Sequence, residues 1–370
     1  MAITPEERKK LCIKRVLCGI RQKAIKEDRK IKIYSKKTLY LPMQLVIDKY
    51  GSIIKRKENV FQVVNENEKK EFSADIISQI MISSGASISS GVIKLAMEKD
   101  IDIVYLNKFG TPYARIYPCK LGGTTLTRRK QATQYYSERI ADVIKEIIRA
   151  KIKNQIGLLR LVEKTRDNVD FSNIINSIKS DSEGIDELNG TIDDIRNKLL
   201  GIEGFASQSY WGALTIVFPF KERQQEAKDI FNSTLNYGYG ILYSEVEKAC
   251  IIAGLDPYLG FMHTDRYGKP SMVLDLIEDF RQPIVDRAIT NLFSRKQIDK
   301  RDVEETGNTL MLSKSGKGKV VDAVLSRLHS ESKYNNKTLS LQAIILEQAR
   351  QIVRVLLDQD KNFEGYVHKW

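Results

Sequence analysis

The sequence predicts an α+β protein with several domains: a small β-strand-rich N-terminal domain, a flexible linker and a larger, all-α C-terminal domain. Two patterns predict this class. Between residues 31 and 116, short apolar runs alternate with turn residues, which is typical of β-strands. After residue 128, apolar residues recur every three or four positions, which is the period of an amphipathic helix. A length of 370 residues is enough for two or three hydrophobic cores of ordinary size.

Charge and turn residues divide the first part of the chain into three segments. Residues 1–30 are predicted to form a basic N-terminal extension, because positions 1–32 hold 11 Lys and Arg residues against four acidic ones. Residues 31–116 are predicted as the β-rich domain, with a β-hairpin around the turn at 48–52. Residues 117–128 are rich in Pro, Gly and Thr and are predicted as the linker.

Residues 129–370 are predicted to form the α-helical catalytic domain. An apolar stripe from Ile140 to Ile148 marks its first long helix. Further helices are expected over residues 185–200, 222–231, 239–253, 272–294, 319–329 and 339–357. The run SKSGKGK at 313–319 lacks the spacing of a phosphate-binding loop, so we interpret it as a basic turn in a short hairpin.

The composition excludes several classes of protein. A net charge of +13 favours a polyanionic partner, with nucleic acid ahead of an anionic membrane. No apolar run is long enough to cross a membrane, and charges interrupt the N-terminus where a signal peptide would be apolar. The four Cys residues form no CxxC pair, which disfavours structural zinc and indicates reduced thiols in a cytoplasmic protein.

Three segments carry residues suited to chemistry. Glu203 is flanked by Gly201 and Gly204 at the end of a predicted helix, where glycines would let a ligand approach closely. His263 follows an apolar pair and precedes basic turn residues. A lone His in such a place is usually a core residue, but the turn favours a loop edge, where functional residues concentrate.

The third segment is a predicted helix with two acidic residues, Asp275 and Glu278, at i and i+3. Both carboxylates would then face one way and would need a cation between them. An ordinary amphipathic face with a Glu278–Arg281 pair is the alternative. Together, two carboxylates and one imidazole suit a divalent metal, Mn²⁺ or Mg²⁺, in phosphodiester chemistry. The aromatic residues Tyr210 and Trp211 could stack on bases, and core packing is the alternative for each.

These segments, in this order, resemble the CRISPR-associated integrase of spacer acquisition, the Cas-one endonuclease family. The resemblance runs from about residue 32 onwards and rests on four stretches of the sequence: LLGIEGFASQSYW, DIFNSTLNYGYGILYSEVEKACIIAGLDPYLGFMH, DRYGKPSMVLDLIEDFRQPIVD and ISSGASISSGVIKLAMEKDIDIVYLNKFG. The family pattern implies a β-strand domain, a linker and a helical domain that binds the metal. The basic extension before residue 32 departs from the pattern.

By position, the resemblance implies that Glu203, His263 and Glu278 ligate the metal. Asp275 would be a nearby catalytic acid that ligates it or orients a ligand. The basic residues Arg266, Lys269 and Arg281 fall where the family contacts DNA. Tyr210 and Trp211 belong to family motifs, and the resemblance implies DNA binding for them without fixing what each one does.

The resemblance also implies an activity and partners. The expected protein is a homodimer that assembles with the small CRISPR partner Cas-two and carries a short DNA duplex with 3′ ends. Each 3′-hydroxyl would attack a phosphodiester at a boundary of the CRISPR repeat, with Mn²⁺ or Mg²⁺ as cofactor and no membrane partner. A casposase, the transposon-encoded relative, is one alternative, and a chain that stops soon after the last predicted helix disfavours it. A non-catalytic DNA-binding scaffold is the other, and the presence of all four site residues argues against it.

Overall fold

The computed structural model describes residues 43–66, 68–110, 112–118, 124–263, 268–307 and 309–370. The predicted basic extension at 1–30 and the predicted DNA contact Arg266 lie outside the described residues. Residues Met43–Trp370 form one compact unit. Within its described residues, no helix is both long and apolar enough to cross a membrane.

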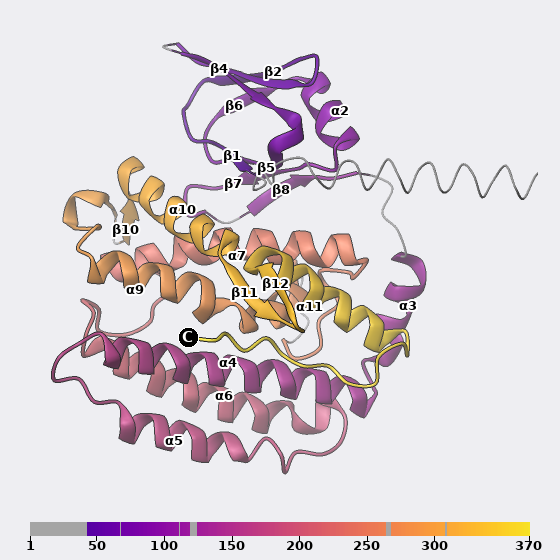
Figure 1. Ribbon diagram of the computed structural model, residues 1–370, viewed down its shortest axis with the longest axis vertical. Helices are drawn as coiled ribbons and strands as arrows, with labels where there is room; N and C mark the ends of the chain where they lie inside the picture. The colour runs from indigo at the N-terminus through magenta and orange to yellow at the C-terminus, as the bar shows by residue number, and fades with distance from the viewer. Residues whose placement is uncertain (1–42, 67, 111, 119–123, 264–267, 308) are drawn as a thin grey trace, which may run out of the picture. The chain divides into compact units, whose positions relative to one another are not determined.

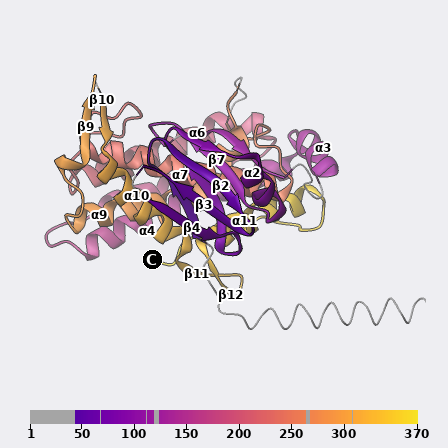
Figure 2. The ribbon, with the colours of Figure 1, turned by 90° about the horizontal axis from the view of Figure 1, so that it is seen from above.

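Two four-stranded sheets make up the first part of this unit (Figures 1 and 2). The first sheet has the order β1-β5-β7-β8, with strands β1 (Met43–Ile47), β5 (Ile77–Ile82), β7 (Asp102–Leu106) and β8 (Pro112–Ile116). The second has the order β4-β3-β2-β6, with strands β2 (Ser52–Lys57), β3 (Val60–Val64), β4 (Lys69–Ser73) and β6 (Ala86–Ile88). The short 3₁₀ helix η1 (Ala74–Ile76) and helix α2 (Ser90–Glu98) complete the region, and Ile54, Phe61, Ile80 and Leu95 share one buried core.

The predicted hairpin at 48–52 is wrong, although the turn itself is present. Gly51 adopts a left-handed conformation with φ of 75°, which glycine reaches without strain. Strand β1 pairs in parallel with β5, whereas β2 pairs with β3 and β6. The turn therefore leads the chain from one sheet into the other. Local turn residues could not reveal this, because the partner of β1 lies some thirty positions further along the chain.

Long helices follow, as the apolar period predicts. They are α3 (Thr124–Gln134), α4 (Glu138–Lys164), α5 (Ser172–Glu183), α6 (Ile192–Thr215) and α7 (Ile230–Ala253). Helix α6 packs between α4 and α5, as Figure 1 shows. Helix α3 begins inside the segment predicted as a linker, and the residues predicted as a helix at 222–231 lie mostly in an irregular segment before α7. The domain boundaries stay a prediction.

The single helix predicted over 272–294 is divided into four short pieces: α8 (Ser271–Leu276), the 3₁₀ helix η2 (Ile277–Asp279), the π-helix η3 (Arg281–Asp286) and α9 (Arg287–Ser294). Pro283 lies in the π-helix, and proline cannot donate a backbone hydrogen bond in a helix interior. The break matters because Asp275, Glu278 and Arg281 lie on different pieces.

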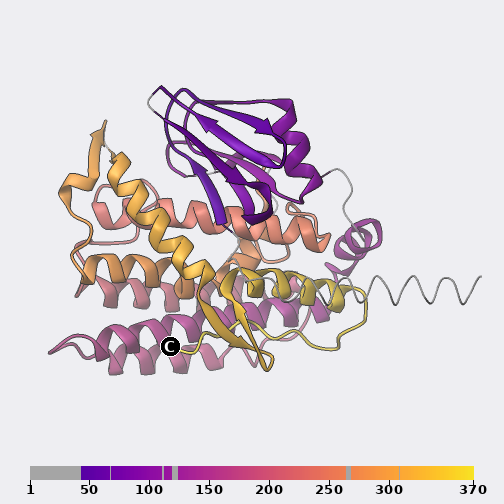
Figure 3. The same cartoon turned by 45° about the horizontal axis from the view of Figure 1, so that its top comes forward.

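The last part of the chain is largely helical rather than all-α, because it contains two β-hairpins. After the 3₁₀ turn η4 (Lys300–Asp302) come β9 (Val303–Thr306), β10 (Thr309–Leu312), α10 (Lys314–His329), β11 (Glu331–Tyr334), β12 (Lys337–Ser340) and α11 (Leu341–Leu356). The run SKSGKGK is not a turn. Its first residue, Ser313, caps α10, and the rest of the run forms the first residues of that helix. Helices α10 and α11 both pack on α7 (Figure 3).

After α11, an extended segment runs back along α4. The buried side chain of Asn154 on α4 holds it: the amide donates to the carbonyl of Tyr366 at 2.8 Å, and its oxygen accepts from the N–H of His368. The same amide donates to the carbonyl of Asp279 in η2 at 3.0 Å. One side chain thus joins α4, η2 and the returning segment.

Candidate active site

Glu203 lies in the middle of α6, not at a helix end as predicted. The helix begins with a capping box between Thr191 and Asp194 and continues to Thr215. A Cβ added at Gly201 or Gly204 would meet no protein atom within 4 Å, so the helix surface beside Glu203 is open. The side chain of Glu203 is 19% exposed to solvent, so it is accessible from that surface.

A lysine lies beside Glu203 that the sequence analysis did not single out. Lys151 is buried on α4, and its ammonium pairs with Glu203 Oε1 and lies 2.6 Å from Glu278 Oε2. Burial alone would lower the pKa of Lys151, but the two carboxylates raise it above its ordinary value. Ser207, one turn after Glu203, also donates to Glu203 Oε1 at 2.8 Å.

Glu278 is a buried carboxylate between two cations. It lies in η2, and Arg281 Nε donates to Glu278 Oε1 at 2.9 Å while Lys151 faces the other oxygen. Burial alone would raise the pKa of Glu278, but the charges of Arg281 and Lys151 outweigh burial and lower it to about 2. Glu278 is therefore ionised at neutral pH. The Glu278–Arg281 pair considered from the sequence is present.

Asp275 does not share a cation with Glu278, contrary to the expectation from their spacing. Its carboxylate turns to residues 261–263 and accepts the backbone N–H groups of Phe261, Met262 and His263 at 2.6, 3.1 and 3.1 Å. It also lies 2.6 Å from Nδ1 of His263. Because an ionised carboxylate only accepts hydrogen bonds, we assign the proton to Nδ1, which leaves the Nε2 lone pair for another partner.

The described residues contain no group of three or more His, Cys, Asp or Glu side chains spaced to hold a metal. The chemistry of the donor set nevertheless fits a divalent cation. Glu203 and Glu278 converge on the ammonium of Lys151, so the two carboxylates already share one positive charge. His263 has the carboxylate-fixed imidazole that is typical of metal-ligating histidines.

Tyr210 is fully buried, so the predicted stacking on DNA does not fit its position. Its hydroxyl donates to Asp286 Oδ2 at 2.8 Å, and the hydroxyl of Tyr239 donates to the other oxygen. Burial raises the pKa of Asp286 to about 6, although the two hydroxyls and nearby arginines oppose that shift. The alternative of core packing holds for Tyr210.

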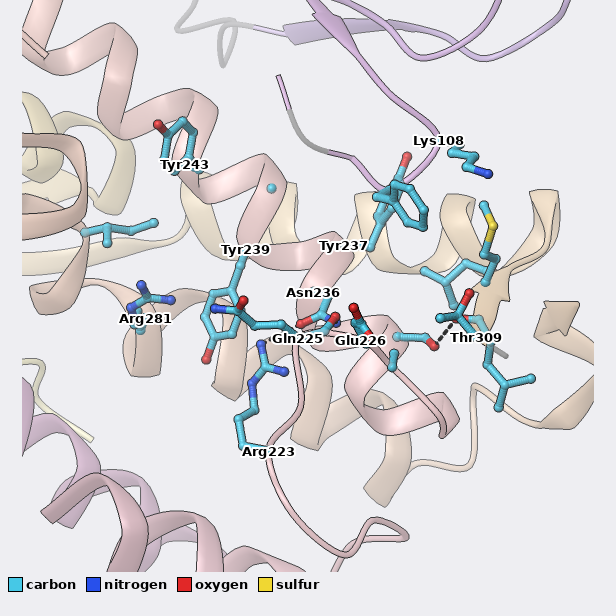
Figure 4. Close-up of a pocket in the computed structure, with 18 residues that line it drawn as sticks. Lys108, Arg223, Gln225, Glu226, Asn236, Tyr237, Tyr239, Tyr243, Arg281 and Thr309 are labelled. Atoms are coloured by element: carbon cyan, nitrogen blue, oxygen red, sulfur yellow. Dashed lines mark hydrogen bonds between the residues drawn. The ribbon is translucent and has the colours of Figure 1, made fainter. Parts of the chain in front are cut away.

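A cavity of about 660 Å³ opens next to this network (Figure 4). The guanidinium groups of Arg223 and Arg281 lie over the ring of Tyr239, 5.4 and 4.9 Å from its centre. Arg223 also lies 5.9 Å from the ring centre of Trp211 and donates to Asn236 Oδ1 at 2.6 Å. The cavity is therefore lined by cations, aromatic rings and amides.

The structure thus sorts the predicted site residues. It brings Glu203 and Glu278 onto Lys151, and it places Arg281 in contact with Glu278 and on the cavity wall. Lys269 is partly exposed and lies shortly after residues 264–267, which fall outside the described part of the chain. Position could have revealed Lys151, because it falls on the apolar stripe of α4 together with the buried amides Asn154 and Gln155.

Comparisons with known proteins agree on one family. Residues 45–325 match the family described as CRISPR associated protein Cas1. A protein named CRISPR-associated endonuclease Cas1 1 from Archaeoglobus fulgidus is 37% identical over 349 residues, covering 89% of this chain and all of the relative. The solved structure titled "Casposase bound to integration product" is similar with a TM-score of 0.77 and 22% identity, covering 87% of this chain and 94% of that one.

A chain of a Cas6-RT-Cas1–Cas2 complex has a TM-score of 0.72 and 19% identity; the match covers 89% of this chain and 36% of that one. At these identities the two solved structures are evidence for the fold. The family match spans most of the chain and includes Glu203, His263, Asp275 and Glu278. The chain belongs to the family of the CRISPR-associated protein Cas1, whose curated members include proteins named endonucleases.

Proposed function

We propose that this protein is a metal-dependent DNA integrase of CRISPR adaptation. It would join the 3′-hydroxyl of a short duplex to a phosphodiester of the CRISPR repeat: the new P–O bond forms as the P–O bond to the leaving 3′-oxygen breaks. One observation carries the proposal. Two ionisable carboxylates from separate helices, Glu203 and Glu278, converge on a single cation, and a third carboxylate, Asp275, orients the imidazole of His263.

In this proposal, Glu203, His263 and Glu278 hold Mn²⁺ or Mg²⁺. A bound ion of this kind supplies Lewis-acid polarisation of the phosphoryl oxygen. Asp275 is a positioning residue, because it fixes the backbone of the preceding segment and the tautomer of His263. Arg281 neutralises one oxygen of Glu278 and directs the other toward the site.

The proposed substrate is DNA. The cavity beside the site combines Arg223 and Arg281 with the rings of Tyr237 and Tyr239, which suits a phosphate backbone and its bases. The casposase similar in fold was solved with an integration product, and curated relatives are named endonucleases. Lys269 and Arg266 remain proposed DNA contacts beside His263.

The proposed partners are a second copy of this chain and a Cas2 protein. Support for Cas2 comes from the similar chain in the Cas6-RT-Cas1–Cas2 complex. The homodimer follows from the family resemblance.

An integration assay tests the proposal. A short duplex with free 3′ ends and a supercoiled plasmid carrying a CRISPR repeat are incubated with Mn²⁺ or Mg²⁺, with and without the Cas2 partner. We expect Glu203→Gln and Glu278→Gln to lose at least about a hundredfold of strand transfer, while affinity for the duplex changes little. Glu304→Gln, on the exposed part of β9, is the matched control.

Strand transfer by Glu203→Gln at the wild-type rate would contradict the site assignment. Binding of DNA by the wild-type protein without any strand transfer or nicking, under all of these conditions, would support the non-catalytic scaffold instead.

A further inference from the structure

We infer that Lys151 is an internal counter-ion that competes with the catalytic metal: its ammonium lies between Glu203 and Glu278, and a divalent cation must displace it to reach both carboxylates. This inference rests on the proposed function, because it concerns the same site. It assigns a role to Lys151, which is not itself a proposed metal ligand: the lysine positions the ligands Glu203 and Glu278.

The contacts of Lys151 define its place. The ammonium pairs with Glu203 Oε1 and lies 2.6 Å from Glu278 Oε2, so a single nitrogen bridges side chains from α6 and η2. The side chain is nearly enclosed, with 10% of its exposure left. Such a bridge stabilises two carboxylates that would otherwise repel each other in a buried site.

The oxygen of Glu278 that faces Lys151 is not saturated. Glu278 Oε2 is buried and accepts no directed hydrogen bond in the described part of the chain, although the ammonium is close. The other oxygen, Oε1, accepts a directed hydrogen bond from Arg281. Oε2 therefore keeps a lone pair with which it can bind another cation.

The local charges explain why the lysine must move. Glu203 and Glu278 carry two negative charges, and Lys151 and Arg281 carry two positive ones, so the cluster is neutral without a metal. A divalent cation that enters this neutral cluster meets two like charges at short range. If the ammonium leaves, repulsion falls and the carboxylates regain the negative charge that a hard cation requires.

Of the two cations, Lys151 is the one free to withdraw. Arg281 is fixed twice, by its hydrogen bond to Glu278 and by its stacking on Tyr239 at 4.9 Å. Lysine has a compact ammonium on a flexible stem, whereas the guanidinium is planar and is oriented by its partners. The metal therefore competes with Lys151 and not with Arg281.

Binding of Mn²⁺ alone to the full-length protein tests the inference. Free Mn²⁺ is measured by its electron paramagnetic resonance signal, without DNA. We expect Lys151→Met to bind Mn²⁺ at least about tenfold more tightly than wild type, because one like charge is removed near a divalent ion. Lys153→Met, an exposed lysine on the same helix, should match wild type.

Thermal unfolding supplies an independent readout. Lys151→Met should melt at a lower temperature than wild type without metal and should gain more from saturating Mn²⁺. Lys151→Gln, which keeps a hydrogen-bond donor but not the charge, takes the place of Lys151→Met if that variant does not fold, and we expect the same direction.

Each outcome decides something. Equal or weaker Mn²⁺ binding by the neutral variants, with wild-type binding intact, overturns the role of Lys151 and leaves the proposed function standing; a supporting rather than competing lysine would give that result. If neither wild type nor the variants bind Mn²⁺, the metal site itself is refuted and the inference fails with it.

Discussion

Nδ1 of His263 lies 2.6 Å from Oδ1 of Asp275, a carboxylate that also accepts three consecutive backbone N–H groups. The acid therefore sets both the path of the backbone over residues 261–263 and the orientation of the His263 ring. An imidazole held in this way presents its other nitrogen in a fixed direction, which is what a metal ligand requires.

Asp275→Asn should consequently damage the site without removing a direct ligand. The amide keeps one acceptor oxygen and adds an N–H₂ group that faces backbone donors, so the segment and the ring both lose their alignment. We expect strand transfer to fall about ten- to a hundredfold, less than for Glu278→Gln. The integration assay measures this, with the exposed Asp322→Asn as control. Unchanged activity would make Asp275 a structural acid only.

Acid should destabilise the metal-free protein through Glu278. Its pKa in the folded protein is about 2, below the ordinary 4.5, so its stabilising contribution is complete above pH 4.5 and is lost as the pH falls toward 2. The size of that contribution is roughly 3 kcal/mol. Urea unfolding from pH 6 to pH 2 should show a steeper loss of the free energy of unfolding in wild type than in Glu278→Gln. Parallel curves would refute the role of Glu278 in this range.

Asn154→Ala should lower stability more than an ordinary polar substitution. The change removes hydrogen bonds to η2 and to the returning segment and leaves buried backbone groups without partners. We expect a loss of about 2–3 kcal/mol in the free energy of unfolding. Denaturant titration measures it, and Asn189→Ala, in an exposed irregular segment, should change stability by less than about 0.5 kcal/mol. Equal effects of the two variants would contradict the joining role of Asn154.

Arg223 should contribute to DNA affinity through charge. The residue lines the cavity and has amide partners rather than a carboxylate partner among the described residues. For Arg223→Gln we expect weaker duplex binding and a salt dependence of affinity shallower by about one unit of log–log slope. Fluorescence anisotropy over a salt series gives both. Arg301→Gln, an exposed residue paired with Asp299, is the control, and identical slopes for both variants and wild type would exclude a phosphate contact.

Local sequence patterns predicted most of the elements but not their pairing. Short apolar runs bounded by turn residues located β3 and β7, and the helical period located α4, because both patterns follow from burial of apolar side chains. The parallel pairing of β1 with β5 depends on residues far apart in the chain and escaped prediction. The break in the 272–294 helix had a visible cause in Pro283, which the apolar period concealed.

For the site, sequence reasoning supplied the acidic residues and the histidine, and geometry supplied their partners. Spacing alone placed Asp275 and Glu278 on one face of one helix, whereas the helix changes type between them and sends each carboxylate to a different partner. Lys151 was missed because it is surrounded in sequence by other Lys residues of α4 that are not buried. Only its position in the helical repeat, on the same face as the buried apolar residues of α4, distinguishes Lys151 from these other lysines.

The clamp formed by Asn154 has a consequence for synthesis on the ribosome. Its partner Asp279 in η2 lies 125 positions further along the chain, but its partner Tyr366 lies 212 positions further, so the returning segment can bind α4 only after most of the chain has been translated. Contacts of such long range form late in folding. A nascent or truncated chain that lacks Tyr366 would therefore hold the segment around Glu278 more loosely.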